Sequence, residues 1–250
     1  MSEAPITRVP PDRGTFVERL SHDPAAAVDE VRAAARAGDA RAQAAFAQMH
    51  SEGRGVACDP AEGVHWYALA ANSGDAHAMN MLGRCHELGR GTPPNAELAA
   101  AWYRKAATAG LDWGMYNFAN LLATGRGVKA DRAAALRWYR RAADLGHAKA
   151  MNLVGRHYEE GWDVERDPLA ALGWYRRSAE GGDFRGQASY AAILAQAGRV
   201  DEAAGWLRRA IETGTPAFLD RLGRELMDSP HAALRRTGAQ MRERAGFGAA

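Results

Sequence analysis

The 250-residue sequence has very little cysteine, with Cys58 and Cys85 its only two thiols. The two residues form no CxxC motif, and neither stands with histidine at the spacing of a structural zinc site. A disulfide framework and a zinc-stabilised fold are therefore not expected. Two isolated cysteines fit a protein of the reducing cytoplasm.

Long apolar runs and an excess of one charge are missing as well. No stretch approaches the ~18 consecutive apolar residues of a membrane-spanning helix, and the N-terminus lacks the apolar core of a secretory signal. Lysine and arginine number 32 against 30 aspartate and glutamate, so the net charge of +2 predicts no attraction to nucleic acid or membranes. We expect a cytoplasmic protein with neither partner, and its alanine, arginine and glycine content is typical of a high-GC bacterium.

Catalytic signatures are absent too. The sequence has neither an SxxK motif nor the GxxxxGK[ST] pattern of a phosphate-binding loop. Cys85 has no local basic cluster that would lower its pKa, which favours a buried, inert thiol. His50 and His86 share one repeat position with Tyr158, which favours aromatic packing over metal ligation. The sequence therefore predicts no catalytic residue, no cofactor and no metal site.

What the sequence does contain is a repeat. A tryptophan–tyrosine pair recurs every 36 residues, at Trp66-Tyr67, Trp102-Tyr103, Trp138-Tyr139 and Trp174-Tyr175. Glycine keeps the same interval at Gly38, Gly74, Gly110, Gly146 and Gly182. A fixed period of this length indicates a solenoid, in which each unit buries its apolar face against its neighbours. We expect Trp138 to belong to the core, so that its truncation costs ~3–5 kcal/mol.

The period divides the chain into predicted segments. Five repeats are expected at 38–73, 74–109, 110–145, 146–181 and a shortened 182–213. Before them we expect a disordered, proline-rich lead at 1–14, then a capping helix within 15–37 that Asp23 and Pro24 open after a short helical remnant at 15–20. After them, 214–250 should form a capping helix pair and a tail.

Each repeat predicts two helices. The first should begin two residues after the first glycine and end at a second glycine in the left-handed conformation, at Gly53, Gly89, Gly125 and Gly161. A third glycine follows in three repeats, but Asp163 replaces it in the fourth, where we expect a different turn. The second helix should be capped by Asp59, Asn95, Asp131, Asp167 and Asp201.

The repeating pattern, Gly-(Asp/His)-Ala-x-Ala…Leu-Gly…Gly-x-Gly-Val…Trp-Tyr-Arg-(Lys/Arg)-Ala-Ala, resembles the Sel-1-like repeat of the tetratricopeptide superfamily. The repeat that begins at Gly74 matches at most positions. The resemblance implies an all-α fold, an α/α superhelical solenoid of helix-turn-helix repeats whose first helices line a concave face. It also implies a non-enzymatic adaptor or scaffold, and it names no partner.

Residues three, six, ten and thirteen positions after each first glycine share one side of the first helices, opposite the apolar side. Trp113 and Tyr116 form the aromatic middle of this ladder. Asparagine can pair with an extended peptide, arginine with a carboxylate, and aromatic residues are frequent interface hot spots. The predicted partner-binding groove comprises His77, Asn80, Arg84, Trp113, Tyr116, Asn120, Lys149, Asn152 and Arg156. The alternative is that Trp113 packs against the next repeat and that the polar residues are solvated surface.

A basic stripe on the second helices suggests another function. It comprises Arg104-Lys105, Arg140-Arg141, Arg176-Arg177 and Arg208-Arg209. A structural subunit could dock through this stripe, although nearby acids favour a solvated face. A third possibility is a β-lactam hydrolase like the cysteine-rich branch of the family, but the cysteine pairs of that branch are missing here. We predict a monomeric adaptor that holds a protein or an extended peptide.

Overall fold

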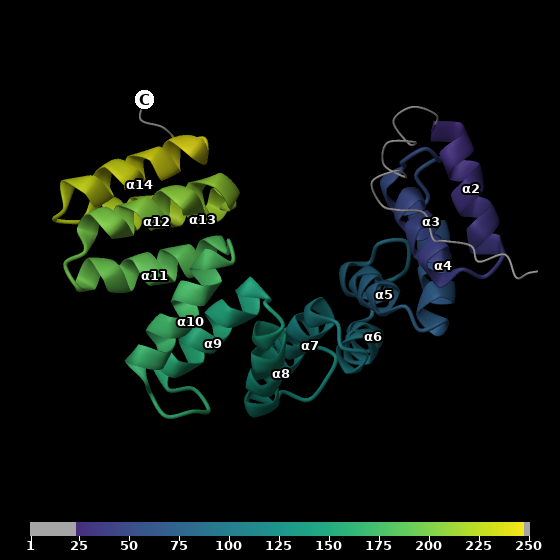
Figure 1. The fold of residues 1–250 in the computed structure, drawn as a ribbon, viewed down its shortest axis with the longest axis horizontal. Helices are drawn as coiled ribbons and strands as arrows, with labels where there is room; N and C mark the ends of the chain where they lie inside the picture. The colour runs from purple at the N-terminus through teal and green to yellow at the C-terminus, as the bar shows by residue number, and fades with distance from the viewer. Residues whose placement is uncertain (1–23, 248–250) are drawn as a thin grey trace, which may run out of the picture. The chain divides into compact units, whose positions relative to one another are not determined.

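The computed structural model describes residues 24–247, which form thirteen α-helices and contain no strand (Figure 1). The predicted lead at 1–14, the helical remnant at 15–20 and the Asp23 cap lie outside these residues. The helices are α2 (Pro24–Arg36), α3 (Ala40–Glu52), α4 (Pro60–Asn72), α5 (Ala76–Leu88), α6 (Ala96–Thr108), α7 (Asp112–Thr124), α8 (Arg132–Asp144), α9 (Ala148–Glu160), α10 (Pro168–Glu180), α11 (Phe184–Gln196), α12 (Val200–Thr213), α13 (Pro216–Met227) and α14 (Ala232–Arg244).

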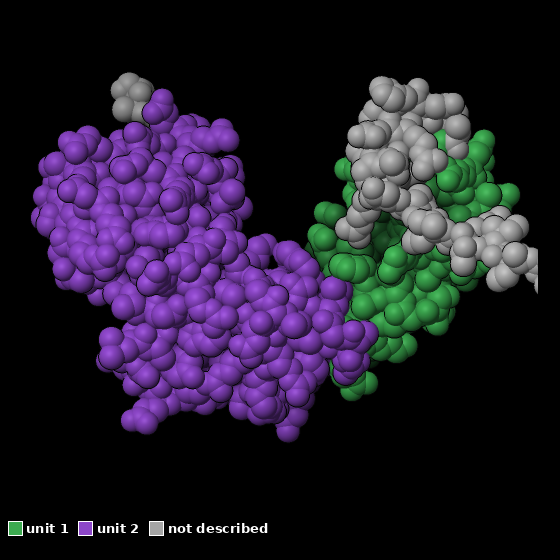
Figure 2. All heavy atoms as spheres, in the orientation of Figure 1, with its two compact units in different colours: residues 1–106 green, residues 107–250 purple. Residues whose placement is uncertain are grey.

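The chain falls into two compact units, residues 1–106 and 107–250 (Figure 2). Within the first unit, α3 packs against both α2 and α4, and α4 against α5. Within the second, each helix from α7 to α11 packs against the next one along the chain. The last two helices, α13 and α14, pair with each other, and α14 also packs on α12. Both units are therefore stacks of antiparallel helix pairs, as the all-α repeat prediction requires.

In four repeats the first helix ends, as predicted, at a glycine in the left-handed conformation. Gly53, Gly89, Gly125 and Gly161 have φ between 67° and 72°, and each donates its N–H to a carbonyl of the preceding helix. Asp163 adopts the same left-handed conformation, with φ of 57°, so the prediction of a different turn in that repeat is wrong. Aspartate tolerates this region better than most residues because its short polar side chain can bond locally. Its carboxylate lies 3.9 Å from His157 Nδ1.

The caps of the second helices are confirmed in four repeats and wrong in the fifth. The side chains of Asp59, Asn95, Asp131 and Asp167 accept hydrogen bonds from backbone N–H groups of the first turn. In the fifth repeat, α12 begins at Val200, Arg199 occupies the cap position, and Asp201 lies inside the first turn. This repeat is shorter, so Gly198 (φ 78°) leads almost directly into the second helix.

The core is built on tyrosine. Tyr67, Tyr103, Tyr139 and Tyr175 are only 1–3% exposed. The tryptophans that precede them are half-buried, and Trp138 packs edge-on against Phe118 of the same repeat with 5.9 Å between ring centres. Tyr139 therefore lies at the centre of the core and Trp138 at its margin, so we expect truncation of Trp138 to cost less than the ~3–5 kcal/mol predicted from the sequence. Adjacent side chains of a helix point about 100° apart, so only one residue of each tryptophan–tyrosine pair can face the centre of the core.

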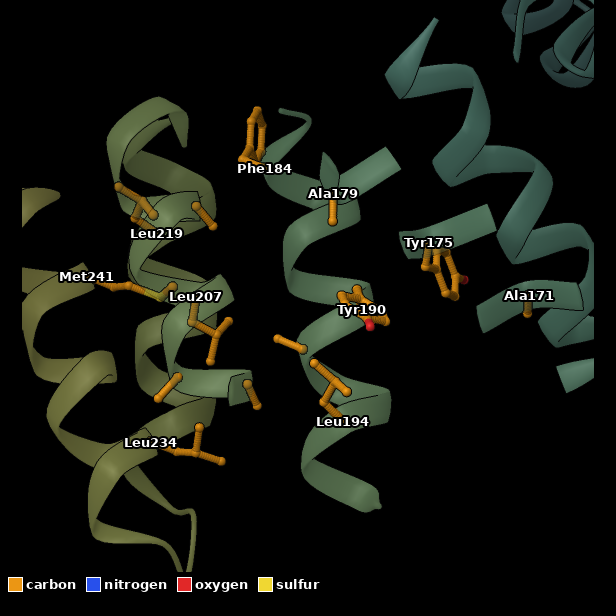
Figure 3. Packing of buried hydrophobic residues seen from close by; sticks show 14 residues of the cluster. Ala171, Tyr175, Ala179, Phe184, Tyr190, Leu194, Leu207, Leu219, Leu234 and Met241 are labelled. Atoms are coloured by element: carbon orange, nitrogen blue, oxygen red, sulfur yellow. The ribbon is translucent and has the colours of Figure 1, made fainter. Parts of the chain in front are cut away.

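The core of unit 2 continues into the C-terminal helices. Figure 3 shows it passing from Tyr175 of α10, past Tyr190 and Leu194 of α11, to Leu207 of α12 and Met241 of α14. The helix pair after the repeats thus covers the apolar side of the last repeat, which is the role of a cap in repeat proteins. Among residues 24–247, no helix is long and apolar enough to cross a membrane.

Candidate functional site

The predicted groove residues fall in both units. His77, Asn80 and Arg84 lie on α5 in unit 1, where His77 and Arg84 are exposed and Asn80 is buried. The other six lie on α7 and α9 in unit 2. Each unit is a body of its own, and unit 2 holds the larger part of the predicted groove.

Trp113 is the most exposed aromatic side chain of the predicted groove, with 43% of its surface accessible. Its ring meets the edge of the His147 imidazole with 4.6 Å between ring centres, and Tyr116 stacks on that imidazole at the same distance. Lys149 Nζ lies 5.1 Å from the centre of the indole. Trp113 therefore contacts the next repeat while keeping much of its surface open, so it has features of both alternatives predicted for it.

Trp113, His147 and Lys149 border a hollow of about 450 Å³, the Trp113 hollow, at the N-terminal ends of α7, α9 and α11. Its walls include Asp112, Trp113, His147, Lys149, Asp183 and Phe184. The lining is mixed: an apolar indole and phenyl ring stand beside two acids, one ammonium and an imidazole. A hollow of this composition can hold an apolar side chain together with polar groups of a polypeptide.

His147 supports this arrangement, and the sequence reasoning missed it. It is 5% exposed and caps α9, where its Nδ1 accepts a hydrogen bond from the Ala150 N–H at 3.2 Å. Burial lowers the pKa of His147 and Lys149 adds to this, while Asp112 and Asp183 oppose it. A signal was present, because the first helices α3, α5 and α11 carry aspartate at the same cap position.

The two asparagines at the sixth repeat position do not face a groove. Asn152 is 4% exposed and its Oδ1 accepts a hydrogen bond from Ser189 Oγ at 3.2 Å, while Asn80 is similarly buried in unit 1. Asn120 is half-buried, and its Oδ1 accepts a hydrogen bond from Tyr139 Oη at 2.7 Å. The predicted role of Asn80 and Asn152 as exposed ligands of a peptide is therefore wrong. A first helix of a stack is covered on two sides, so its buried side is wider than one apolar stripe.

Two of the core tyrosine hydroxyls bond to glutamates at the last polar position of the ladder. Tyr103 donates to Glu87 at 2.6 Å and Tyr175 to Glu159 at 2.5 Å. Burial raises the pKa of Tyr175, and the bond to Glu159 adds to this; burial likewise raises the pKa of Tyr67 to about 12. Both glutamates are thus engaged by their own repeat, so they contribute to the fold.

Arg156 lies at a second hollow, of about 220 Å³, which we call the Trp162 hollow. It is lined by Ala123, Thr124, Arg132, Tyr139, Leu153, Arg156, His157 and Trp162. The guanidinium carbons of Arg132 and Arg156 lie 5.5 and 5.3 Å from the centre of the Trp162 ring. Trp162 has no equivalent in the Trp-Tyr pattern, so the repeat analysis did not single it out.

The basic stripe is largely engaged within the protein. In four repeats the second basic residue stands over the tryptophan three residues earlier. The charged group lies 4.0 Å from the ring centre for Lys105 on Trp102, 4.9 Å for Arg141 on Trp138, 4.3 Å for Arg177 on Trp174 and 4.5 Å for Arg209 on Trp206. Among the first members, Arg140 donates to Tyr158 Oη and Arg176 pairs with Glu180. These contacts favour the interpretation of the stripe as a structural, solvated surface.

The two cysteine thiols and the potential metal ligands of the described part of the chain were candidates for reactive groups. Burial raises the pKa of the Cys85 thiol, which disfavours the thiolate at neutral pH. Cys58 is exposed, and its Sγ lies 3.8 Å from the Ser51 carbonyl oxygen. Within residues 24–247, no group of three or more histidine, cysteine, aspartate or glutamate side chains is placed to hold a metal ion.

A profile of the Sel1 repeat matches residues 40–75, 76–111, 114–147 and 148–183. These segments make up more than half of the chain. The chain belongs to the Sel1 repeat family. Sel1 repeats generally mediate protein–protein interaction and are generally non-catalytic.

Solved structures of Sel1 proteins share this fold. A Sel1 repeat protein from Oxalobacter formigenes is 26% identical with a TM-score of 0.78, over 93% of this chain and 99% of that one. A protective antigen of uropathogenic Escherichia coli strains with an SLR fold is 27% identical with a TM-score of 0.74, over 94% of this chain and 52% of the antigen. This chain thus spans about half the length of the antigen. No curated protein matches the sequence.

Proposed function

We propose that this Sel1 repeat protein is a non-enzymatic adaptor that binds a segment of a partner protein at the Trp113 hollow. The observation that carries the proposal is Trp113 itself, a large apolar side chain left 43% exposed beside a hollow of about 450 Å³. A tryptophan in this position exposes apolar surface to water, and a partner that covers it gains the free energy of burial.

The neighbours of Trp113 prepare it for binding. Contacts with His147 and with Lys149 hold the indole in one orientation before any partner arrives. A side chain that is already ordered loses little conformational entropy on binding, so more of the contact energy appears as affinity. Rigid aromatic residues beside a pocket are typical binding hot spots.

The occupant we propose is an extended polypeptide segment. The Trp113 hollow lies at the start of α9, and Arg156 projects from nearly the same side of that helix two turns later. Lys149 and Arg156 thus mark a path along α9 that a chain segment, but not a small ligand, can follow. We further propose that the protein acts as a monomer in the cytoplasm of a bacterium.

The test captures a partner with the wild-type protein and compares how tightly wild type and a variant of the Trp113 hollow bind it. Trp113→Ala should retain the fold and weaken binding of the captured partner at least ~10-fold, by loss of a hot spot worth ~2 kcal/mol or more. Leu169→Ala is the matched control, because Leu169 is an exposed apolar residue on α10. The partner identified by mass spectrometry is then purified and titrated calorimetrically against each protein. Equal affinities of wild type and Trp113→Ala would reject the Trp113 hollow.

The basic stripe provides the alternative. If the protein docked through it, charge reversal at Arg140 and Arg141 would abolish association and Trp113→Ala would not. The contacts of Arg140 with Tyr158 and of Arg141 with Trp138 argue against that outcome.

A further inference from the structure

We propose that unit 2 contains a carboxylate-binding site, formed by Arg132 and Arg156 at the Trp162 hollow, that receives an acidic side chain of the partner segment. The site itself is argued from the hollow alone. Its occupant rests on the proposed function, because the partner segment is the one that the Trp113 hollow would bind.

Three elements bring the site together. Arg132 is the first residue of α8, Arg156 lies on α9, and Trp162 lies in the loop between α9 and α10. Helices α8 and α9 pack side by side, as do α9 and α10 (Figure 1). Both guanidinium groups lie within cation–π distance of the Trp162 ring, and both arginines line the same hollow.

Within residues 24–247 no acid pairs with either charge, and the nearest acids along α9 are Glu159 and Glu160, one turn after Arg156. Arg132 and Arg156 are both exposed, and across residues 24–247 neither forms an ion pair. The Trp162 hollow has no acidic residue in its lining. Asp163 follows Trp162 in the chain, but its carboxylate lies near His157 Nδ1. Two like charges that line one hollow repel each other, and an anion bound in that hollow would be attracted to both.

The shape of the Trp162 hollow indicates which anion fits. Its volume of about 220 Å³ is below the ~300–1,000 Å³ of most small-molecule pockets, so one side chain fills it better than a cofactor. Leu153, Tyr139 and Ala123 provide apolar wall beside the charged groups. Methylene groups can lie against this wall while a carboxylate accepts hydrogen bonds from the guanidinium groups. A glutamate side chain has this combination of an apolar stem and a charged end.

The position of the site also predicts a spacing in the partner. Lys149, over Trp113, and Arg156, over Trp162, are seven residues apart on α9. Seven residues are nearly two helical turns, so the two side chains leave the same side of the helix roughly 10 Å apart. An extended chain advances ~3.3 Å per residue. The partner should therefore carry its acidic residue about three positions from the apolar residue that covers Trp113.

The first experiment needs no partner. Sodium propionate is titrated into the full-length ¹⁵N-labelled protein, and the indole N–H signal of Trp162, assigned with a Trp162→Phe variant, is followed by NMR. Propionate should shift this signal saturably, and propionamide, its neutral counterpart, should not. Arg132→Gln/Arg156→Gln should weaken the propionate response at least ~10-fold. Arg208→Gln/Arg244→Gln is the matched control, because it removes two exposed positive charges elsewhere and should respond like wild type.

Several results would overturn the site: an equal response to propionamide, an undiminished response in Arg132→Gln/Arg156→Gln, or saturable binding of inorganic phosphate without any binding of propionate. Because propionate binding does not involve Trp113, these failures leave the proposed partner-binding function untouched.

The occupant is tested separately by selecting random twelve-residue peptides on the full-length protein. Enriched peptides should carry an acidic residue about three positions from an apolar one, and Arg132→Gln/Arg156→Gln should remove the enrichment of acids. Enriched peptides without acids, or no enriched peptides while propionate still binds, would retain the carboxylate site and reject this occupant.

Discussion

Helices α5 of unit 1 and α9 of unit 2 occupy the same place in their repeats, and their structural roles agree closely. In both, an asparagine is buried, a glycine lies against a core tyrosine, and a glutamate accepts the hydroxyl of that tyrosine. The residues are Asn80, Gly83, Tyr103 and Glu87 for α5 and Asn152, Gly155, Tyr175 and Glu159 for α9. The shared residues of the repeat therefore give these two first helices the same packing.

The two helices differ at their ends. Asp75 caps α5, whereas His147 caps α9, stacks on Tyr116 and meets the ring of Trp113 edge-on. After α5 the turn contains Arg90, whereas after α9 the same position is Trp162, whose ring contacts Arg132 and Arg156. Both hollows of unit 2 depend on these departures from the repeat. In this protein the shared positions build the framework, and the exceptions mark the proposed site.

The largest effect should come from removing a shared core tyrosine. Tyr175→Ala should lower the free energy of unfolding by ~3–5 kcal/mol, because it leaves a cavity and removes the hydrogen bond to Glu159. Trp174→Ala should cost about half as much, since Trp174 is half-buried beneath Arg177. The same difference should separate Tyr139→Ala from Trp138→Ala. Urea unfolding followed by circular dichroism measures both pairs, and a greater loss for the tryptophan variants would contradict the assignment of the core.

A smaller effect should follow from filling the space opposite those tyrosines. A Cβ at Gly83 or at Gly155 would come within 2.7 Å of the ring of Tyr103 or Tyr175. Gly83→Ala and Gly155→Ala should each destabilise the protein by ~1–3 kcal/mol through overpacking. Gly173→Ala is the control, because a Cβ there meets nothing within 4 Å. Unequal costs at the two glycines would show that the two repeats are packed differently.

His147→Asp gives α9 the cap that α5 has and should act on binding more than on stability. Aspartate is a good N-cap, so the free energy of unfolding at neutral pH should change by less than ~1 kcal/mol. The indole of Trp113 would lose the imidazole that orients it, and we expect partner affinity to fall ~3–10-fold. Calorimetric titration of the captured partner tests this, and an unchanged affinity would show that His147 only caps the helix.

The same substitution should change the pH dependence of stability. Burial holds the pKa of His147 below its ordinary value of 6.5. As pH falls below 6.5, the unfolded chain binds a proton that the folded chain does not, so the free energy of unfolding decreases until the folded-state pKa is reached. Between pH 7 and 5, His147→Asp should therefore lose less stability than wild type. His86, whose pKa burial also lowers, should still contribute in both proteins.

The smallest effect is expected at Asp163. Its φ of 57° disfavours residues with a Cβ that cannot bond locally, so Asp163→Ala should cost ~1 kcal/mol. Asp163→Gly restores the glycine of the other repeats and should change stability by less than ~0.5 kcal/mol. Thermal unfolding of the two variants decides this, and equal melting temperatures would mean that the backbone conformation is not the constraint.

Local rules were enough to predict the helices. The left-handed glycines at Gly53, Gly89, Gly125 and Gly161 and the caps at Asp59 and Asp131 depend on a few neighbouring residues, so a single sequence reveals them. The rule failed at Asp201, where a shortened repeat moved the start of the helix. The candidate site was predicted only in part: Trp113, Lys149 and Arg156 lie on exposed or half-buried surface of unit 2, but Asn152 does not.

The sequence by itself determined the repeat, most of the helix boundaries and the left-handed glycines that end the first helices, because these follow from periodicity and from residues close along the chain. Only the tertiary structure decided which polar residues are buried and where charges gather. Asn152 meets Ser189, 37 residues away, and Arg132 meets Trp162, 30 residues away. Such contacts depend on how neighbouring helices pack, which no local pattern records.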